Sequence, residues 1–164
     1  MNANRRALSL LASVLVSLFV GVAGLAPAGA QTSAAEPASL APLTASIQSP
    51  PGDARVARRF AVDGVVNGTY RNLWLVVRVG DLYWPKEPKL SPVKGRWTGW
   101  VNEGGRPPGG RFEVLLIDVP DAPSAAFEAW LGEGRRTGRY PGIRQAEVRE
   151  AAILDRRSYQ LAGS

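Results

Sequence analysis

The sequence predicts an all-β fold: an antiparallel β-sandwich with one short helix, behind an N-terminal signal peptide. Short apolar segments recur at roughly 8–12 residues with turn residues between them, a spacing typical of sandwiches. The 164 residues include 18 glycines and 13 prolines, which favours a turn-rich fold. Only one segment carries helical periodicity, so a helical bundle is not expected.

Residues 1–30 have the organisation of a signal peptide. Arg5 and Arg6 precede an uncharged apolar stretch, and Ala28-Gly29-Ala30 suits signal peptidase, with Gln31 as the expected new N-terminus. The chain is therefore expected to be secreted, or to lie in the periplasm or cell envelope without a stable membrane anchor. An uncleaved anchor is the alternative, because about 20 apolar residues can span a bilayer. The paired arginines leave both general secretion and the twin-arginine route open.

Residues 31–45 are expected to form a flexible linker, since they are rich in alanine, proline, serine and threonine and hold only one charge, Glu36. The sandwich is assigned to residues 46–162. Loss of the signal arginines lowers the formal net charge from +6 to +4. That value is ordinary for a soluble protein, and we expect no nucleic-acid partner.

The strands are expected in the following order. Residues 47 and 56 lie in short extended pieces on either side of a proline-glycine turn, and residues 60–66 form a strand ended by Asn67-Gly68. Residues 73–79 and 111–119 are apolar on both faces, which predicts central strands buried between layers. Residues 82–84 and 96–101 form shorter strands, residues 103–110 a glycine-proline loop, and a last strand lies within residues 146–161.

One helix is predicted after residue 120. Asp121 is expected to cap it and Pro123 to lie in its first turn. Phe127, Trp130 and Leu131 recur at the spacing of one helix face. Glycines at positions 132 and 134 are expected to end the helix.

The order of these signals resembles a known module. The chain contains Ile-x-Ser-Pro-Pro-Gly from residue 47, Val-x-Gly from 62, Leu-Trp-Leu-Val-Val from 73, Tyr-Trp-Pro from 83, Gly-Arg-Trp-Thr from 95 and Phe-Glu-Val-Leu-Leu-Ile from 112. This series is similar to the immunoglobulin-like β-sandwich modules of bacterial secreted and multidomain proteins, over about residues 47–159. The resemblance implies an immunoglobulin-like fold and an accessory role, and it carries over no catalytic residue.

The composition removes much catalytic chemistry. The chain has no cysteine and no histidine, so it can form no disulfide, thiolate site, Ser-His-Asp triad or zinc site of the usual ligands. A general base would have to be a carboxylate or lysine with a strongly shifted pKa. We expect no enzyme, no cofactor and no metal site, and an unrecognised carboxylate enzyme is the remaining alternative. Turn and cap roles explain the candidate carboxylates Asp63, Asp81, Glu103, Asp118 and Asp121.

Aromatic residues are the first candidates for binding. Trp74 and Trp97 are expected in the core, and Trp100 should face the opposite side of its strand from Trp97 because their spacing is odd. Tyr83 or Trp84 is expected beside Trp100 on the surface, and all three are candidate binding residues. Exposed rings of this kind can stack on sugars.

A basic loop over residues 134–144 is the second candidate. Arg135, Arg136 and Arg139, with Tyr140 beside them, could hold phosphate or uronate groups through bidentate hydrogen bonds. The alternative is a solvated loop whose charges are neutralised by the acids nearby in sequence: Glu128, Glu133 and Glu147.

The sequence thus predicts a non-catalytic exported module that acts through protein or cell-surface contacts. The alternative is a small glycan- or cell-wall-binding module that uses exposed aromatic residues. The expected partner is accordingly an unknown protein or an envelope glycan. Two or more coplanar exposed rings would favour the glycan.

Overall fold

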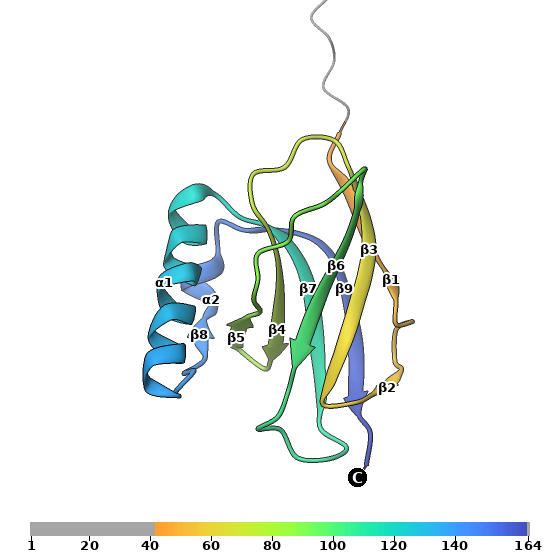
Figure 1. Ribbon diagram of the computed structural model, residues 1–164, viewed down its shortest axis with the longest axis vertical. Coiled ribbons are helices and arrows are strands. Elements are labelled where there is room, and N and C mark those ends of the chain that lie inside the picture. Colours follow the sequence, from red (N-terminus) through yellow and green to blue (C-terminus); the bar gives the residue numbers. More distant parts are fainter. Residues whose placement is uncertain (1–41, 164) are drawn as a thin grey trace, which may run out of the picture. The chain divides into compact units, whose positions relative to one another are not determined.

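The computed structural model describes residues 42–163, whose β-strands form two sheets accompanied by two helices (Figure 1). The predicted signal peptide and most of the predicted linker lie outside the described residues. The first strand begins at Thr44, inside the range predicted as linker. The strands are β1 Thr44–Ser49, β2 Arg55–Val56, β3 Arg59–Asn67, β4 Leu73–Val79, β5 Leu82–Pro85, β6 Arg96–Asn102, β7 Arg111–Asp118, β8 Ile143–Arg144 and β9 Ala152–Leu161; the helices are α1 Asp121–Thr137 and α2 Gln145–Val148.

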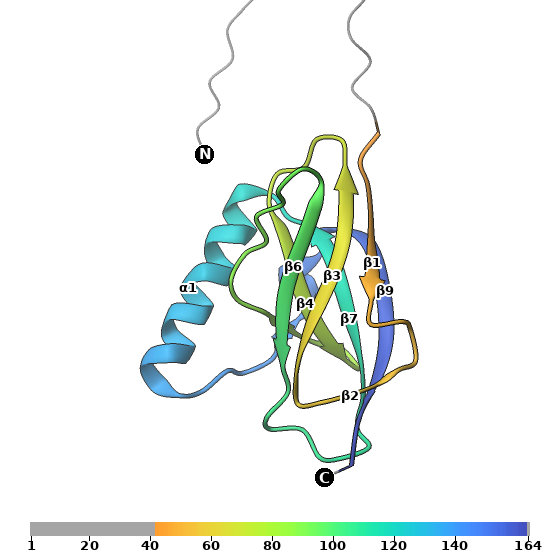
Figure 2. The same cartoon turned by 45° about the vertical axis from the view of Figure 1, so that its right-hand side comes forward.

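The strands form a three-stranded and a six-stranded sheet. The smaller sheet has the order β1-β3-β6 and the larger has the order β2-β9-β7-β4-β5-β8. All pairings are antiparallel except that of β2 with β9. Figure 2 shows the smaller sheet in front of β4, β7 and β9 of the larger one.

The main hydrophobic core lies between the two sheets. In β3 and β6 every second side chain is buried, as expected for strands with one face in the core and one toward solvent. Gly64 lies under the Trp97 ring, because a Cβ there would overlap the indole. The predicted burial of Trp97 and of the central-strand side chains is confirmed: Leu75, Val77, Trp97, Phe112, Val114 and Leu116 are all buried in this core.

A second core lies on the outer face of the larger sheet, where α1 packs. Trp74 meets Phe127 of the helix edge to face, with 5.5 Å between ring centroids, and its Nε1 donates to Ser124 Oγ at 3.0 Å. Leu115 and Leu131 lie in the same cluster. The prediction that β4 and β7 are buried on both faces is confirmed, and the helix layer is the physical reason.

The helix bounds differ from the prediction at both ends. Asp121 is not the cap but the first helical residue, and its carboxylate accepts a hydrogen bond from Asn72 Nδ2 at 2.8 Å. The glycines at 132 and 134 do not end the helix, because the buried face formed by Phe127 and Leu131 holds this segment against the sheet. The helix ends instead at Thr137 and is capped by Gly138, which has a left-handed φ of 70°.

The segment from α1 to β9 also corrects the predicted basic loop. Arg135 and Arg136 lie in the last turn of α1 rather than in a loop, and residues 143–148 form β8 and the second helix, α2, which was not predicted. The last strand, β9, lies within the predicted range. Neither helix in this part of the chain combines the length and the apolar content that a bilayer crossing requires.

Candidate binding groove

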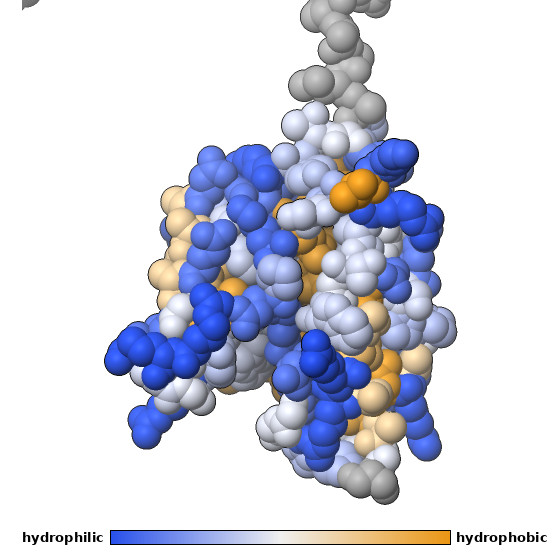
Figure 3. Space-filling view, viewed as in Figure 1, coloured by the Kyte–Doolittle hydropathy of each residue, from blue (hydrophilic) through white to orange (hydrophobic). Residues whose placement is uncertain are grey.

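A groove of about 830 Å³ lies between the C-terminal half of α1 and the loop that follows β6. Figure 3 shows the surface hollowed between these two parts of the chain. We call it the aromatic groove; it is lined by Arg59, Trp84, Pro85, Lys86, Glu87, Trp100, Asn102, Glu103, Gly104, Gly105, Arg106, Pro107, Trp130, Leu131, Gly138 and Tyr140.

The helix-side wall consists of three aromatic rings held by the backbone of residues 140–141. Trp84 Nε1 donates to the carbonyl oxygen of Tyr140 at 3.0 Å, and Trp130 Nε1 donates to that of Pro141 at 3.1 Å. The Trp130 and Tyr140 rings meet at 5.5 Å between centroids and 63° between planes. Because both indole N–H groups are used within the protein, these two indoles present carbon surface to the groove.

Two glycines make room for these rings. A Cβ on Gly134 would overlap the Tyr140 ring, and a Cβ on Gly142 would lie 2.7 Å from Trp84 Cζ2. The helix backbone at Gly134 is therefore the flat surface on which Tyr140 rests. This packing explains a glycine inside α1, where it otherwise costs about 1 kcal/mol relative to alanine.

The opposite wall is Trp100, on the outer face of β6. Its side chain is 47% exposed while that of Trp97 is 3% exposed, which confirms that the two face opposite sides of the strand. The Arg59 guanidinium lies 4.9 Å from the Trp100 ring centroid, a cation–π contact. Among residues 42–163, no carboxylate lies within ion-pair distance of Arg59.

A buried charge cluster fixes the loop at the end of the groove. Glu103 is 7% exposed and accepts from Lys86 Nζ and from Arg106 Nη2, each at 2.7 Å. Arg58 Nη1 donates to the carbonyl oxygens of Gly104 and Arg106, each at 2.8 Å. Because two cations meet one carboxylate, the cluster keeps a formal charge of +1.

The structure brings together some of the predicted site residues and separates others. Trp84, Trp100 and Tyr140 line the one groove. Tyr83 was predicted on the surface, but it is 5% exposed and lies in the cluster beneath α1. The strand alternates its faces, so Tyr83 and Trp84 point in opposite directions.

The predicted arginine cluster does not converge on one point. Arg135 pairs with Glu87 of the groove wall, and Arg136 pairs with Glu133 one helical turn earlier, at 2.7 Å. Arg139 is exposed and is not among the groove residues. The pairing of Glu133 with Arg136 is the neutralisation considered from the sequence.

Three basic residues of the groove were not predicted: Arg59, Lys86 and Arg106. Ala61 pairs with Trp100 and Arg59 with Asn102, so Arg59 and Trp100 are diagonal neighbours on one face of the sheet. Only the register of β3 against β6 reveals this contact.

The coplanar platform that would favour a glycan is not formed by Trp130 and Tyr140, whose planes are tilted by 63°.

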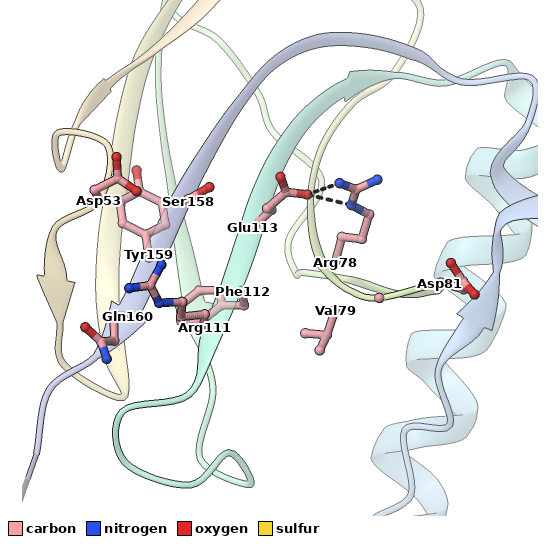
Figure 4. A pocket seen from close by; sticks show the side chains of 11 residues that line it. Asp53, Arg78, Val79, Asp81, Arg111, Phe112, Glu113, Ser158, Tyr159 and Gln160 are labelled. Carbon is pink, nitrogen blue, oxygen red and sulfur yellow. Dashed lines mark hydrogen bonds and ion pairs between the residues drawn. The ribbon is translucent and has the colours of Figure 1, made fainter.

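A second depression, of about 720 Å³, lies on the part of the larger sheet that Figure 4 shows. It is polar, and Arg78 and Glu113 form an ion pair within it. Side-chain hydrogen bonds that the Arg78 guanidinium makes to Tyr83 and Glu113 raise the pKa of Arg78. Burial raises the pKa of Tyr159 to about 12, and the Tyr159 hydroxyl donates to the carbonyl oxygen of Pro50 at 3.0 Å. The residues that line this second depression include no exposed aromatic ring.

Two of the remaining candidate carboxylates, Asp118 and Asp63, make hydrogen bonds within the fold, and Asp81 lines the second depression. Asp118 accepts the backbone N–H groups of Arg71 and Asn72 at 2.9 and 3.0 Å, and Asp63 accepts the Thr98 hydroxyl at 2.6 Å. Within residues 42–163, no group of three or more acidic side chains is placed to hold a metal ion.

Comparison with known proteins finds no matching family model and no matching curated relative.

Proposed function

We propose that this protein is a non-catalytic exported binding module that acts at the cell surface through the aromatic groove. The observation that carries the proposal is the construction of the groove. Its rings are held by internal hydrogen bonds and by two glycines that make room for them, so binding would require little reordering. Export rests on the basic and apolar pattern of residues 1–30.

An immunoglobulin-like fold is part of this proposal, and the strand order supports it. Strands β1, β3 and β6 form one sheet, and β4, β5, β7 and β9 belong to the sheet that faces it. The short strand β2, which follows β1 in the chain, pairs with β9 in the second sheet. Such sandwiches place their A, B and E strands opposite C, F and G in the same way. The departure is Trp74, which points to α1, so that Trp97 of β6 is the core tryptophan.

The absence of catalysis is supported by the roles of the acidic groups. Glu103 is the carboxylate of the groove cluster, and both its oxygens are engaged by cations. A carboxylate in this setting is a structural anion rather than a general base. Glu87, the other acid of the groove, pairs with Arg135.

Sedimentation with an isolated cell-envelope fraction tests the proposal. We expect the purified protein to sediment with the envelope, and the double variant Trp100→Ala/Tyr140→Ala to remain in the supernatant. Val93→Ala/Ile153→Ala is the matched control, because those side chains are 72% and 55% exposed and do not line the groove. Circular dichroism of both variants serves as the control for correct folding.

Equal sedimentation of the groove variant and the wild type would show that the groove is not the binding surface. The same incubation is assayed for released sugar and peptide. Turnover that is lost in Glu103→Gln would overturn the non-catalytic assignment.

A further inference from the structure

We propose that the ligand of the aromatic groove is an acidic glycan, a chain of sugars that carry carboxylate groups. This inference rests on the proposed function and adds the chemical class of the ligand. Two properties of the groove carry it: its unpaired positive charge, and the use of the Trp84 and Trp130 indole N–H groups within the protein.

The charge of the groove selects an anion. Arg59 stacks on Trp100 without a carboxylate partner among the described residues, and the Glu103 cluster retains a charge of +1. Arg135, at the rim, neutralises Glu87. A guanidinium held against an aromatic ring loses little conformational entropy on binding. Its two parallel N–H groups can donate bidentate hydrogen bonds to a carboxylate.

The aromatic surface selects a sugar ring over a peptide. An extended proline-rich peptide presents carbonyl oxygens that need donors, and aromatic grooves that bind such peptides supply them. Here Trp84 and Trp130 donate their N–H groups to the backbone of residues 140–141. These two indoles therefore offer carbon faces beside cationic donors, which match the C–H faces and the carboxylates of an acidic sugar. Because the Trp130 and Tyr140 rings are tilted by 63° rather than coplanar, we expect the carboxylate contacts, and not stacking on a flat platform, to select this ligand.

Isothermal titration calorimetry with matched probes tests the inference. The probes are oligogalacturonate, its methyl ester, which has the same rings without the charge, and a polyglutamate peptide, which has the charge without the rings. We expect the acid to bind about tenfold more tightly than the ester, the effect of one charge-assisted bidentate contact. Arg59→Gln should abolish this preference. Arg111→Gln, which removes a charge from the other depression, should keep it.

Equal affinity for the acid and the ester would overturn the inference, and so would polyglutamate binding as tightly as oligogalacturonate. If none of the probes binds while envelope sedimentation still depends on Trp100 and Tyr140, the ligand class is wrong and the proposed function stands. If groove-dependent sedimentation is also absent, both fail.

Discussion

Replacing Gly134 with alanine has opposite effects on the helix propensity of α1 and on the packing of Tyr140 in the groove. An alanine in a helix interior is favoured over glycine by about 1 kcal/mol. At Gly134, however, the new methyl group would overlap the Tyr140 ring, so the ring must leave the helix. At Gly132, on the same helix, a Cβ meets no atom within 4 Å. Gly132→Ala is therefore the matched control.

The structure sets the expected magnitudes. Gly132→Ala should raise the free energy of unfolding by about 1 kcal/mol, or roughly 4 °C in Tm. Gly134→Ala gains the same helix propensity but loses the Trp130–Tyr140 ring pair, worth about 1 kcal/mol, and the burial of Tyr140 on the helix, worth another 1 kcal/mol or so. Its net change is a loss of about 1 kcal/mol, so the two variants differ by about 2 kcal/mol.

Urea denaturation followed by circular dichroism measures both variants, and envelope sedimentation measures binding. We expect Gly132→Ala to be more stable and to bind as the wild type does, and Gly134→Ala to be less stable and to bind weakly. If Gly134→Ala is stabilised as much as Gly132→Ala and still binds, Tyr140 does not rest on the helix and the reasoning about the groove is refuted.

Three further predictions concern the core, the pH dependence and export. Trp97→Ala should cost about 3–5 kcal/mol of stability by urea denaturation, because the buried indole leaves a cavity, and a near-wild-type midpoint would contradict its place in the core. Because burial raises the pKa of Tyr159 from 10.0 to about 12, stability should be unaffected by this group below pH 10 and fall between pH 10 and 12. Tyr159→Phe should remove that fall, and an unchanged profile would count against it. N-terminal sequencing of the exported protein should begin at Gln31; a retained Met1 in a membrane fraction would contradict cleavage.

The layers of the fold were predictable because they depend on burial. Segments with both faces apolar, as in β4 and β7, can be stable only between two other layers. The placement of Trp97 and Trp100 on opposite faces of β6 follows from the two-residue period of a strand. The end of α1 was not predictable from propensity. Tertiary packing of its buried face continues the helix through Gly132 and Gly134.

The candidate site was predictable in its aromatic part and not in its charged part. Trp84, Trp100 and Tyr140 stand out by residue type, whereas Arg59 joins them only through the register of β3 against β6. Tyr83 was misplaced because its neighbour Trp84 takes the surface face and α1 covers the other. The partners of Glu103 depend on the path of a loop, which no local period encodes.

The most direct test of the groove uses the five tryptophans as probes in a ¹⁵N–¹H NMR titration with soluble fragments of cell-envelope glycan. Trp84, Trp100 and Trp130 line the groove, and Trp74 and Trp97 are buried in the two cores as internal controls. We predict that the indole N–H signals of the three groove residues shift with a common saturation curve and that the two core signals stay in place. Saturable binding that moves none of the three groove signals would contradict the assignment of the binding surface.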